Sequence, residues 1–128
     1  SGMKAPKYFF TNVKRHGALL AKGRMLGIQF DTLFTDQLYF KVSRHAITMA
    51  TRIRSIFQKH GIAIAYDSPT NQQFVILSPT LYDALSKKVA FEIWERKSDT
   101  EIICRFVTSW ATKEEELDEL DHILQTLK

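Results

Sequence analysis

The sequence predicts an α+β fold, a small two-layer domain with a short, mainly antiparallel sheet of about four strands and helices on one face. The first observation is a long amphipathic segment, in which apolar residues recur at three- and four-residue spacing between Val42 and Phe57. The second is a series of short apolar or alternating segments after Gly61, separated by turn residues. The third is the length, because 128 residues, 45% of them hydrophobic, suffice for one domain with its own core.

Two long helices are predicted to open the chain. The first extends from about Phe9 to Gln29 although it contains three glycines, each of which costs about 1 kcal/mol relative to alanine in an exposed helix. This cost indicates that the segment packs against another element or approaches a ligand. The second helix is predicted to begin with Asp36 as its N-cap and to end just before Gly61.

Four strands and two further helices are predicted downstream. The strands are expected over residues 62–66, 72–77, 91–95 and 101–108, with a turn over 67–71 and a hairpin loop over 96–100. Ser78 as N-cap, followed by Pro79, predicts a short helix between the second and third strands. Thr112, with Glu115 three residues later, predicts a capping box for the last helix. The apolar stripe of that helix consists of Leu117, Leu120, Leu124 and Leu127.

No internal repeat, low-complexity tract or linker divides the sequence, so residues 3–128 are expected to form a single domain. Ser1 and Gly2 precede Met3 and are interpreted as the remnant of a removed expression tag. No apolar run approaches the roughly 18 residues of a membrane-spanning helix, and no signal-peptide pattern opens the chain. These features predict a cytoplasmic protein with no membrane partner.

Positive charge is concentrated near the start of the chain, where residues 3–30 contain six basic and no acidic side chains. Residues 112–128 carry six acidic side chains instead. A basic segment can bind nucleic acid, a phosphate group or an acidic partner surface, or it can face solvent. Since the sequence has neither an RNA-binding aromatic–glycine pattern nor a helix-turn-helix pattern, we do not expect nucleic acid as a partner.

The residues do not assemble into a recognisable catalytic site. The sequence lacks a dinucleotide-binding glycine motif, a Walker P-loop, a nucleophile elbow and a zinc-protease motif. The four histidines follow no metal-ligand spacing, and Cys104 lies in an apolar strand where a small buried residue is expected rather than a nucleophile. We therefore assign no catalytic residue and no metal ligand in this chain.

Arg105 is the exception, because it interrupts the apolar strand 102–108. An arginine is rarely buried in a strand unless it is paired. Its guanidinium either binds a ligand carboxylate through two parallel hydrogen bonds, or faces solvent, or pairs with Glu92 or Glu95 on the neighbouring strand. Spacing alone leaves these alternatives open.

Three segments, in the right order, resemble the C-terminal third of the threonine aldolase and β-eliminating lyase family. They are Arg15–Arg24 (RHGALLAKGR), Asp67–Gln72 (DSPTNQ) and Arg105–Trp110 (RFVTSW). The third, which precedes an acidic capped helix, is the most specific. The resemblance extends from about Tyr8 to the last helix. Members of this family are pyridoxal-phosphate enzymes of the aspartate-aminotransferase fold, so it implies a domain like their C-terminal one.

The resemblance also implies roles for individual residues. The arginine of the Arg-Phe-Val-Thr strand binds the α-carboxylate of the amino-acid substrate in this family, which gives that role to Arg105. A glycine-rich segment early in this region approaches the cofactor phosphate, often across a subunit interface. An arginine common there aligns with Leu20 in this chain, which leaves Lys22 as the cofactor-binding candidate and Arg24 as the alternative.

In this family the Schiff-base lysine and the residues that hold the pyridine ring lie upstream of the matching region. The resemblance therefore implies the substrate-binding domain of a carbon–carbon lyase that is inactive as an isolated chain and does not hold pyridoxal phosphate stably. Its expected partner is a large pyridoxal-phosphate domain or a second copy of the chain. The alternative is a non-catalytic dimerisation module derived from the same family.

Overall fold

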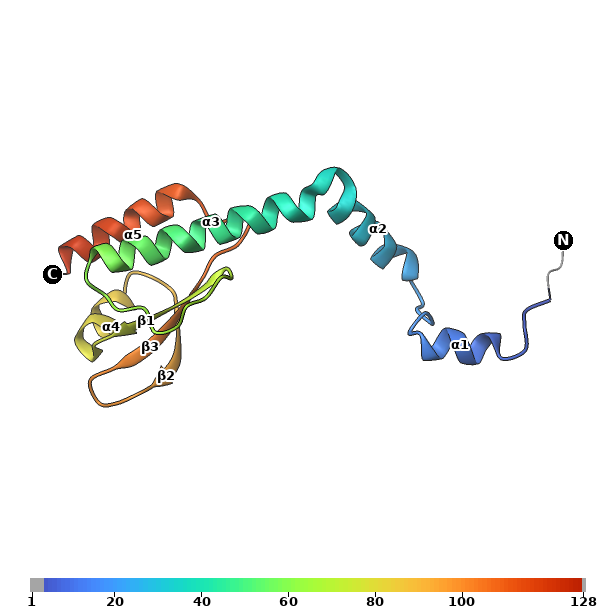
Figure 1. Cartoon of the computed structure of the whole chain (residues 1–128), viewed down its shortest axis with the longest axis horizontal. Helices are drawn as coiled ribbons and strands as arrows, with labels where there is room; N and C mark the ends of the chain where they lie inside the picture. Colours follow the sequence, from blue (N-terminus) through green and yellow to red (C-terminus); the bar gives the residue numbers. More distant parts are fainter. Residues whose placement is uncertain (1–3, 128) are drawn as a thin grey trace. The chain divides into compact units, whose positions relative to one another are not determined.

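The computed structural model describes residues 4–127. Ser1 and Gly2, interpreted above as a tag remnant, lie outside the described residues. The chain divides into two compact units, Ser1–Tyr39 and Phe40–Lys128. Figure 1 shows the helices and strands of each unit.

The first unit contains helices α1 (Phe9–Arg15) and α2 (Gly23–Phe34). The single helix predicted over residues 9–29 is therefore wrong. The helix ends because Gly17 adopts a left-handed backbone, with φ 65°, which glycine reaches without steric cost. Two backbone hydrogen bonds close this end, from Gly17 N to Lys14 O (3.0 Å) and from Ala18 N to Val13 O (2.9 Å). No residue of either helix is buried.

A 3-10 turn, η1 (Thr35–Gln37), precedes the long helix α3 (Leu38–Lys59). The predicted N-cap role of Asp36 is wrong, because its backbone is left-handed (φ 50°) and it lies inside η1 rather than directly before α3. The predicted end of the helix is confirmed: α3 ends at Lys59, and Gly61 follows with φ 75°. The buried face of α3 consists of Ala46, Met49, Ala50, Ile53, Ile56 and Phe57.

Three antiparallel strands form the sheet, β1 (Gln72–Leu77), β2 (Glu92–Arg96) and β3 (Ile102–Val107), in the order β1-β3-β2. The strand predicted over residues 62–66 is reduced to one bridge, between Ile64 and Val75. This segment cannot pair along its whole length, because the Ile62 N–H closes the end of α3 by donating to Phe57 O (2.9 Å). The sheet thus has three strands where about four were predicted.

The helices pack on one face of this sheet, which confirms the predicted two-layer α+β class. Helix α4 (Pro79–Leu85) follows β1, and helix α5 (Glu114–Thr126) lies beside α3 (Figure 1). Residues of the sheet and of all three helices share one hydrophobic core. Its strand members are Val75, Leu77, Ile102, Cys104 and Phe106, and its members from α4 and α5 are Leu85, Leu117, Leu120, Ile123 and Leu124.

The starts of the two short helices can be compared with the predicted caps. Ser78 caps α4 as predicted, since its hydroxyl accepts a hydrogen bond from Leu81 N at 3.3 Å. The capping box predicted for Thr112 and Glu115 is wrong by one residue. Instead, Glu116 Oε2 accepts from Lys113 N at 3.0 Å. Lys113 is the N-cap because α5 begins at Glu114, and the Thr112 hydroxyl instead accepts from Ser109 N at 2.9 Å.

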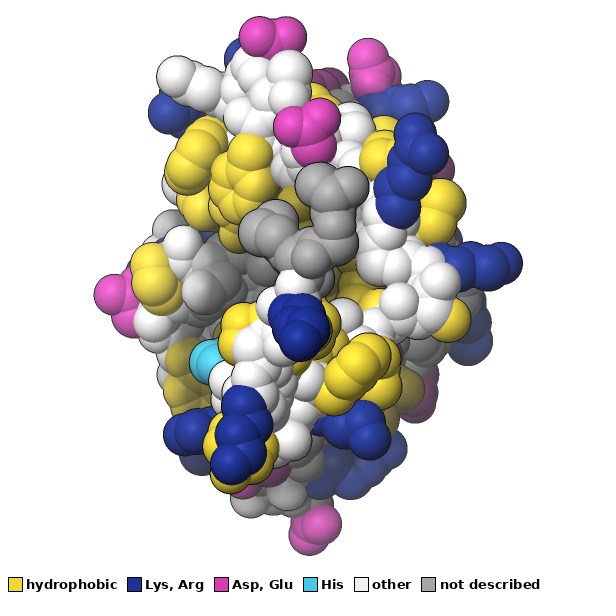
Figure 2. Space-filling model, turned by 90° about the vertical axis from the view of Figure 1, so that its right-hand side faces the viewer, with side chains coloured by type: hydrophobic (Ala, Val, Ile, Leu, Met, Phe, Trp, Pro, Cys, Tyr) yellow, Lys and Arg dark blue, Asp and Glu magenta, His cyan; other side chains and the backbone are white. Residues whose placement is uncertain are grey.

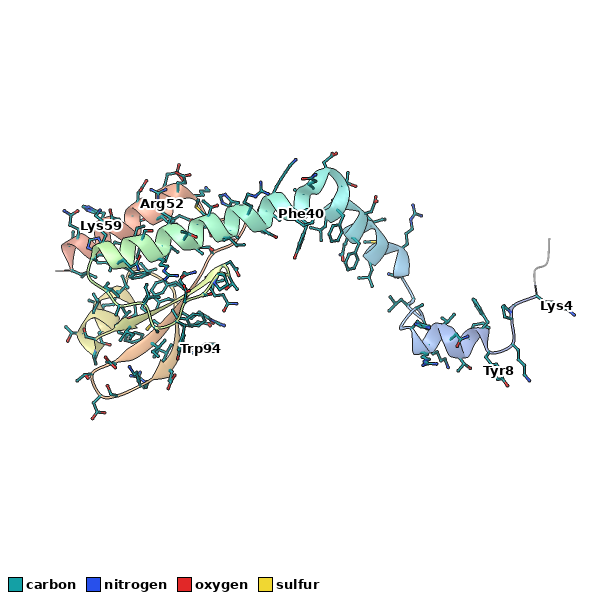
Figure 3. The ribbon with its side chains drawn as sticks, in the orientation of Figure 1. Lys4, Tyr8, Phe40, Arg52, Lys59 and Trp94 are labelled. Carbon is teal, nitrogen blue, oxygen red and sulfur yellow. The ribbon has the colours of Figure 1, made fainter. Side chains whose placement is uncertain are left out.

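A row of ion pairs joins α3 to α5. Arg52 pairs with Glu114 (3.0 Å) and with Asp118, and Figure 3 shows Arg52 and Lys59 on α3 beside α5. At the end of α3, Asp121 accepts from Lys59 Nζ and from His60 Nε2, both at 2.6 Å. These hydrogen bonds lower the pKa of Asp121, and the one from Lys59 has the largest effect.

We predict that Asp121→Asn destabilises the chain in a pH-dependent way. A carboxyl group with a lowered pKa in the folded state stabilises that state above its unfolded-state pKa of about 3.9, and this stabilisation is lost as the pH falls through the lowered value. Urea unfolding from pH 6 to pH 3 should show the variant less stable than the parent at pH 6, with the difference shrinking below pH 4. Asp99→Asn, in the loop between β2 and β3, is the matched control; a deficit that did not change with pH would contradict the prediction.

Candidate functional site

Arg105 lies in the middle of β3, the central strand of the sheet. Its neighbours in the strand, Cys104 and Phe106, are buried in the core. Because successive side chains of a strand point to opposite faces, Arg105 projects from the other face. We call this the outer face of the sheet and define it by Gln72, Phe74, Glu92, Trp94, Glu95 and Arg105.

The Arg105 side chain is 27% exposed and has three partners on the outer face. Its Nη2 donates to the Glu92 carboxylate, which forms an ion pair with it, and its Nη1 donates to Gln72 Oε1 at 3.4 Å. The guanidinium carbon lies 5.3 Å from the centroid of the Trp94 ring, within the range of a cation–π contact. Its Nε is buried and has no hydrogen-bond partner.

Three aromatic rings continue this cluster across the outer face. Tyr66 and Phe74 have ring centroids 5.5 Å apart, and Phe74 and Trp94 have centroids 5.2 Å apart, both edge to face. Tyr66 Oη also donates to Glu95 Oε2 at 3.2 Å. Partial desolvation of the Tyr66 side chain and the nearby Glu95 carboxylate raise the pKa of Tyr66. The arginine thus lies at one end of an aromatic row, not on a bare polar surface.

The structure shows the Arg105–Glu92 pair, one of the alternatives that spacing alone left open, and a bulge in β2 brings Glu95 to the same face. Glu92 pairs with Arg105 and Glu95 pairs with Ile103, so the register shifts by one residue between Ile93 and Glu95. A strict period of two would put Glu92 and Glu95 on opposite faces, whereas the extra residue puts both on the outer face. The alternation of residues 91–95 indicates a strand but contains no sign of the bulge.

Thr108 fixes the end of β3 to the rest of the domain. It is 1% exposed, and its hydroxyl donates to Ala46 O in α3 at 2.7 Å. Asn71, just before β1, donates from Nδ2 to Thr108 O at 2.7 Å. Two of the three segments that carry the family resemblance therefore meet here, and their contacts hold the strand that presents Arg105.

Cys104 is fully buried on the core face, and burial raises the pKa of its thiol to about 11. The neutral thiol acts as a small apolar group, as the apolar strand predicted. Across residues 4–127, no three His, Cys, Asp or Glu side chains gather where they could hold a metal ion.

Lys22 lies in the first unit and Arg105 in the second. Lys22 directly precedes α2, and its side chain is exposed and makes no cap hydrogen bond. The first turn of α2 contains no acidic residue and includes Arg24. Backbone N–H groups at a helix start and adjacent cations are features that can bind a phosphate group.

Comparison with solved structures gives the decisive similarity. A structure of threonine aldolase from Leishmania major matches 95% of this chain with a TM-score of 0.83 and 35% sequence identity. The chain spans about a third of that protein, 36% of its length. No protein-family model matches the chain, and no curated protein matches it.

The chain is consistent with a C-terminal domain of the threonine aldolase family. The resemblance inferred from the sequence is thereby confirmed, as is the expectation of a small domain like the C-terminal one of pyridoxal-phosphate transferases. The match also supports a fragment of a pyridoxal-phosphate-dependent family. Among residues 4–127, none of the helices is both long enough and apolar enough to span a bilayer.

Proposed function

We propose that this chain is the substrate-carboxylate-binding domain of a cytoplasmic, pyridoxal-phosphate-dependent lyase of the threonine-aldolase or β-eliminating type. The observation that carries the proposal is Arg105, a guanidinium held on the outer face of the central strand. A rigid strand and flanking contacts to Gln72 and Trp94 restrict the orientation of the planar group. A planar guanidinium of fixed orientation recognises a carboxylate through two parallel hydrogen bonds.

Lys22 is the residue of this chain that would meet the cofactor phosphate, with Arg24 as the alternative. The support is the exposed position of Lys22 directly before α2 and the absence of acidic side chains from the first turn of that helix. When bound, pyridoxal phosphate supplies the electron sink for cleavage at the α and β carbons. The role of Arg105 is to orient the substrate by its α-carboxylate, and the catalytic groups are supplied from outside this chain.

The partner we propose is a large pyridoxal-phosphate domain or a second copy of this chain. The first unit supports this, because large hydrophobic side chains of α1 and α2 are exposed, including Phe9, Phe10, Met25, Leu26, Ile28, Phe30 and Phe34. Figure 2 shows hydrophobic side chains at the surface among Lys and Arg side chains. Exposed apolar groups of this extent mark an interaction surface. The same observation supports the alternative function, a non-catalytic dimerisation module.

Substitution of Arg105 tests the carboxylate-binding role. Arg105→Lys keeps the charge but removes the paired donors, so the affinity for L-threonine should fall about tenfold or more. The measurement is an NMR titration of the labelled chain with L-threonine. Arg96→Lys, on the neighbouring strand, should leave the affinity unchanged. Equal affinities of the parent and the Arg105→Lys chain would show that Arg105 is structural.

Incubation with pyridoxal phosphate, followed by borohydride reduction and peptide mass spectrometry, tests the expected inactivity of the chain alone. We expect no lysine to be modified stoichiometrically, because an aldimine on an exposed lysine without contacts to the ring is not held in place. Stoichiometric reduction at one position, such as Lys22, would instead place the Schiff-base residue within this chain.

Light scattering across a concentration series tests the proposed interaction surface. The parent chain should show a mass above the 14.8 kDa of one chain at high concentration. The double variant Phe10→Ser/Phe30→Ser should move this mass toward that of one chain, because it removes exposed apolar area from α1 and α2. Trp110→Ser, which changes an equally exposed aromatic residue in the second unit, is the control. A parent chain that stays monomeric at every concentration would rule out self-association.

A further inference from the structure

The Glu92 carboxylate forms an ion pair with the guanidinium of Arg105 in this structure. The two residues are directly paired across β2 and β3, and such cross-strand pairs have Cβ atoms only about 5 Å apart. The contact therefore follows from the register of the sheet. Glu92 itself is 68% exposed on its side chain, so it has room to turn away from the sheet.

The atom that Glu92 engages is the one that an incoming carboxylate needs. A guanidinium offers two forks for a pair of parallel hydrogen bonds, one from Nε and Nη2 and one from Nη1 and Nη2. The Nε of Arg105 is buried, so the fork of Nη1 and Nη2 is the one that a ligand can reach, and Glu92 is bonded to Nη2 of this fork. Gln72 additionally accepts from Nη1. Both nitrogens of this fork thus already have an acceptor, and a second carboxylate that takes the fork meets the negative charge of Glu92 at Nη2.

We propose that Glu92 is an internal carboxylate that competes with the substrate carboxylate for Arg105. This rests on the proposed function of Arg105. Glu92 forms an ion pair with the guanidinium when no ligand is bound. When a ligand carboxylate binds the fork, the Glu92 side chain turns outward. The displaced carboxylate stays on the outer face and repels a second anion. Glu92 thus lowers the affinity for carboxylate ligands and favours those that carry no further negative charge.

Glu95 provides a matched comparison within the same strand. It lies on the same outer face, but its carboxylate accepts from Tyr66 Oη and is not bonded to Arg105. Glu92→Gln and Glu95→Gln remove the same charge from positions three residues apart. Only the first removes the carboxylate bonded to Arg105, so only the first is expected to change how Arg105 binds an anion.

The experiment is an NMR titration of the 15N-labelled chain with acetate, at constant ionic strength maintained with chloride. The probes are the Nε–H resonance of Arg105, assigned from its loss in Arg105→Lys, and the backbone amide resonances of β3, which every variant retains. Before any acetate is added, Glu92→Gln should shift the Nε–H resonance and Glu95→Gln should not. On titration, Glu92→Gln should bind acetate about two- to fivefold more tightly than the parent, which is the range expected for loss of an exposed ion pair. Glu95→Gln should bind like the parent.

The outcomes separate the competition from the proposed function. If Glu92→Gln leaves the acetate-free Arg105 resonance unchanged, or binds acetate no more tightly than the parent does, the competition is refuted while carboxylate binding at Arg105 stands. If Arg105→Lys binds acetate as well as every other variant does, carboxylate binding at Arg105 fails, and the competition fails with it. If Glu92→Gln binds acetate more tightly than the parent and Arg105→Lys abolishes acetate binding, both the competition and carboxylate binding at Arg105 are supported.

Discussion

Packing of the helices on only one face of the sheet is the constraint on which the rest of the structure depends. β3 places Cys104 and Phe106 in the core, and period-two alternation then leaves Arg105 on the outer face. A charged side chain facing the core would need a buried partner, whereas the outer face offers Glu92 and solvent. The helices on the other face therefore make a central, rigidly held arginine possible, and Arg105 in turn gives the outer face its chemistry.

Rigidity of that strand comes from contacts outside the sheet as well. Thr108 bonds to Ala46 in α3, and Asn71 bonds back to Thr108, so the end of β3 is joined to the long helix and to the start of β1. The ion pairs of Arg52 and of Asp121 then hold α3 against α5. A site that must hold a planar group in a fixed orientation benefits from a strand fixed at several points.

The elements with strong local patterns were predictable from sequence. β1 has the predicted bounds, Ser78 caps α4, and the end of α3 lies at Gly61, because alternation, capping and glycine act over a few residues. The structure departs from the predicted elements where a single residue changed the backbone conformation or the strand register. The left-handed Gly17 divided a predicted helix, and the bulge in β2 moved Glu95 to the outer face. Arg105 was found from its apolar neighbours, but its aromatic setting depends on strand register, which periodicity does not specify.

Arg52 and Arg105 differ in what their ion pairs connect. Arg52 joins α3 to Glu114 and Asp118 of α5, two helices with no shared backbone ladder, so its pairs add a connection between elements. Arg105 pairs with Glu92 across strands that backbone hydrogen bonds already join. Breaking the Arg105–Glu92 pair therefore leaves the two strands joined. Its cost is that the guanidinium charge of Arg105 loses its carboxylate partner. A ligand carboxylate in the same place restores that charge balance, which is the property that suits Arg105, and not Arg52, to exchange one carboxylate for another.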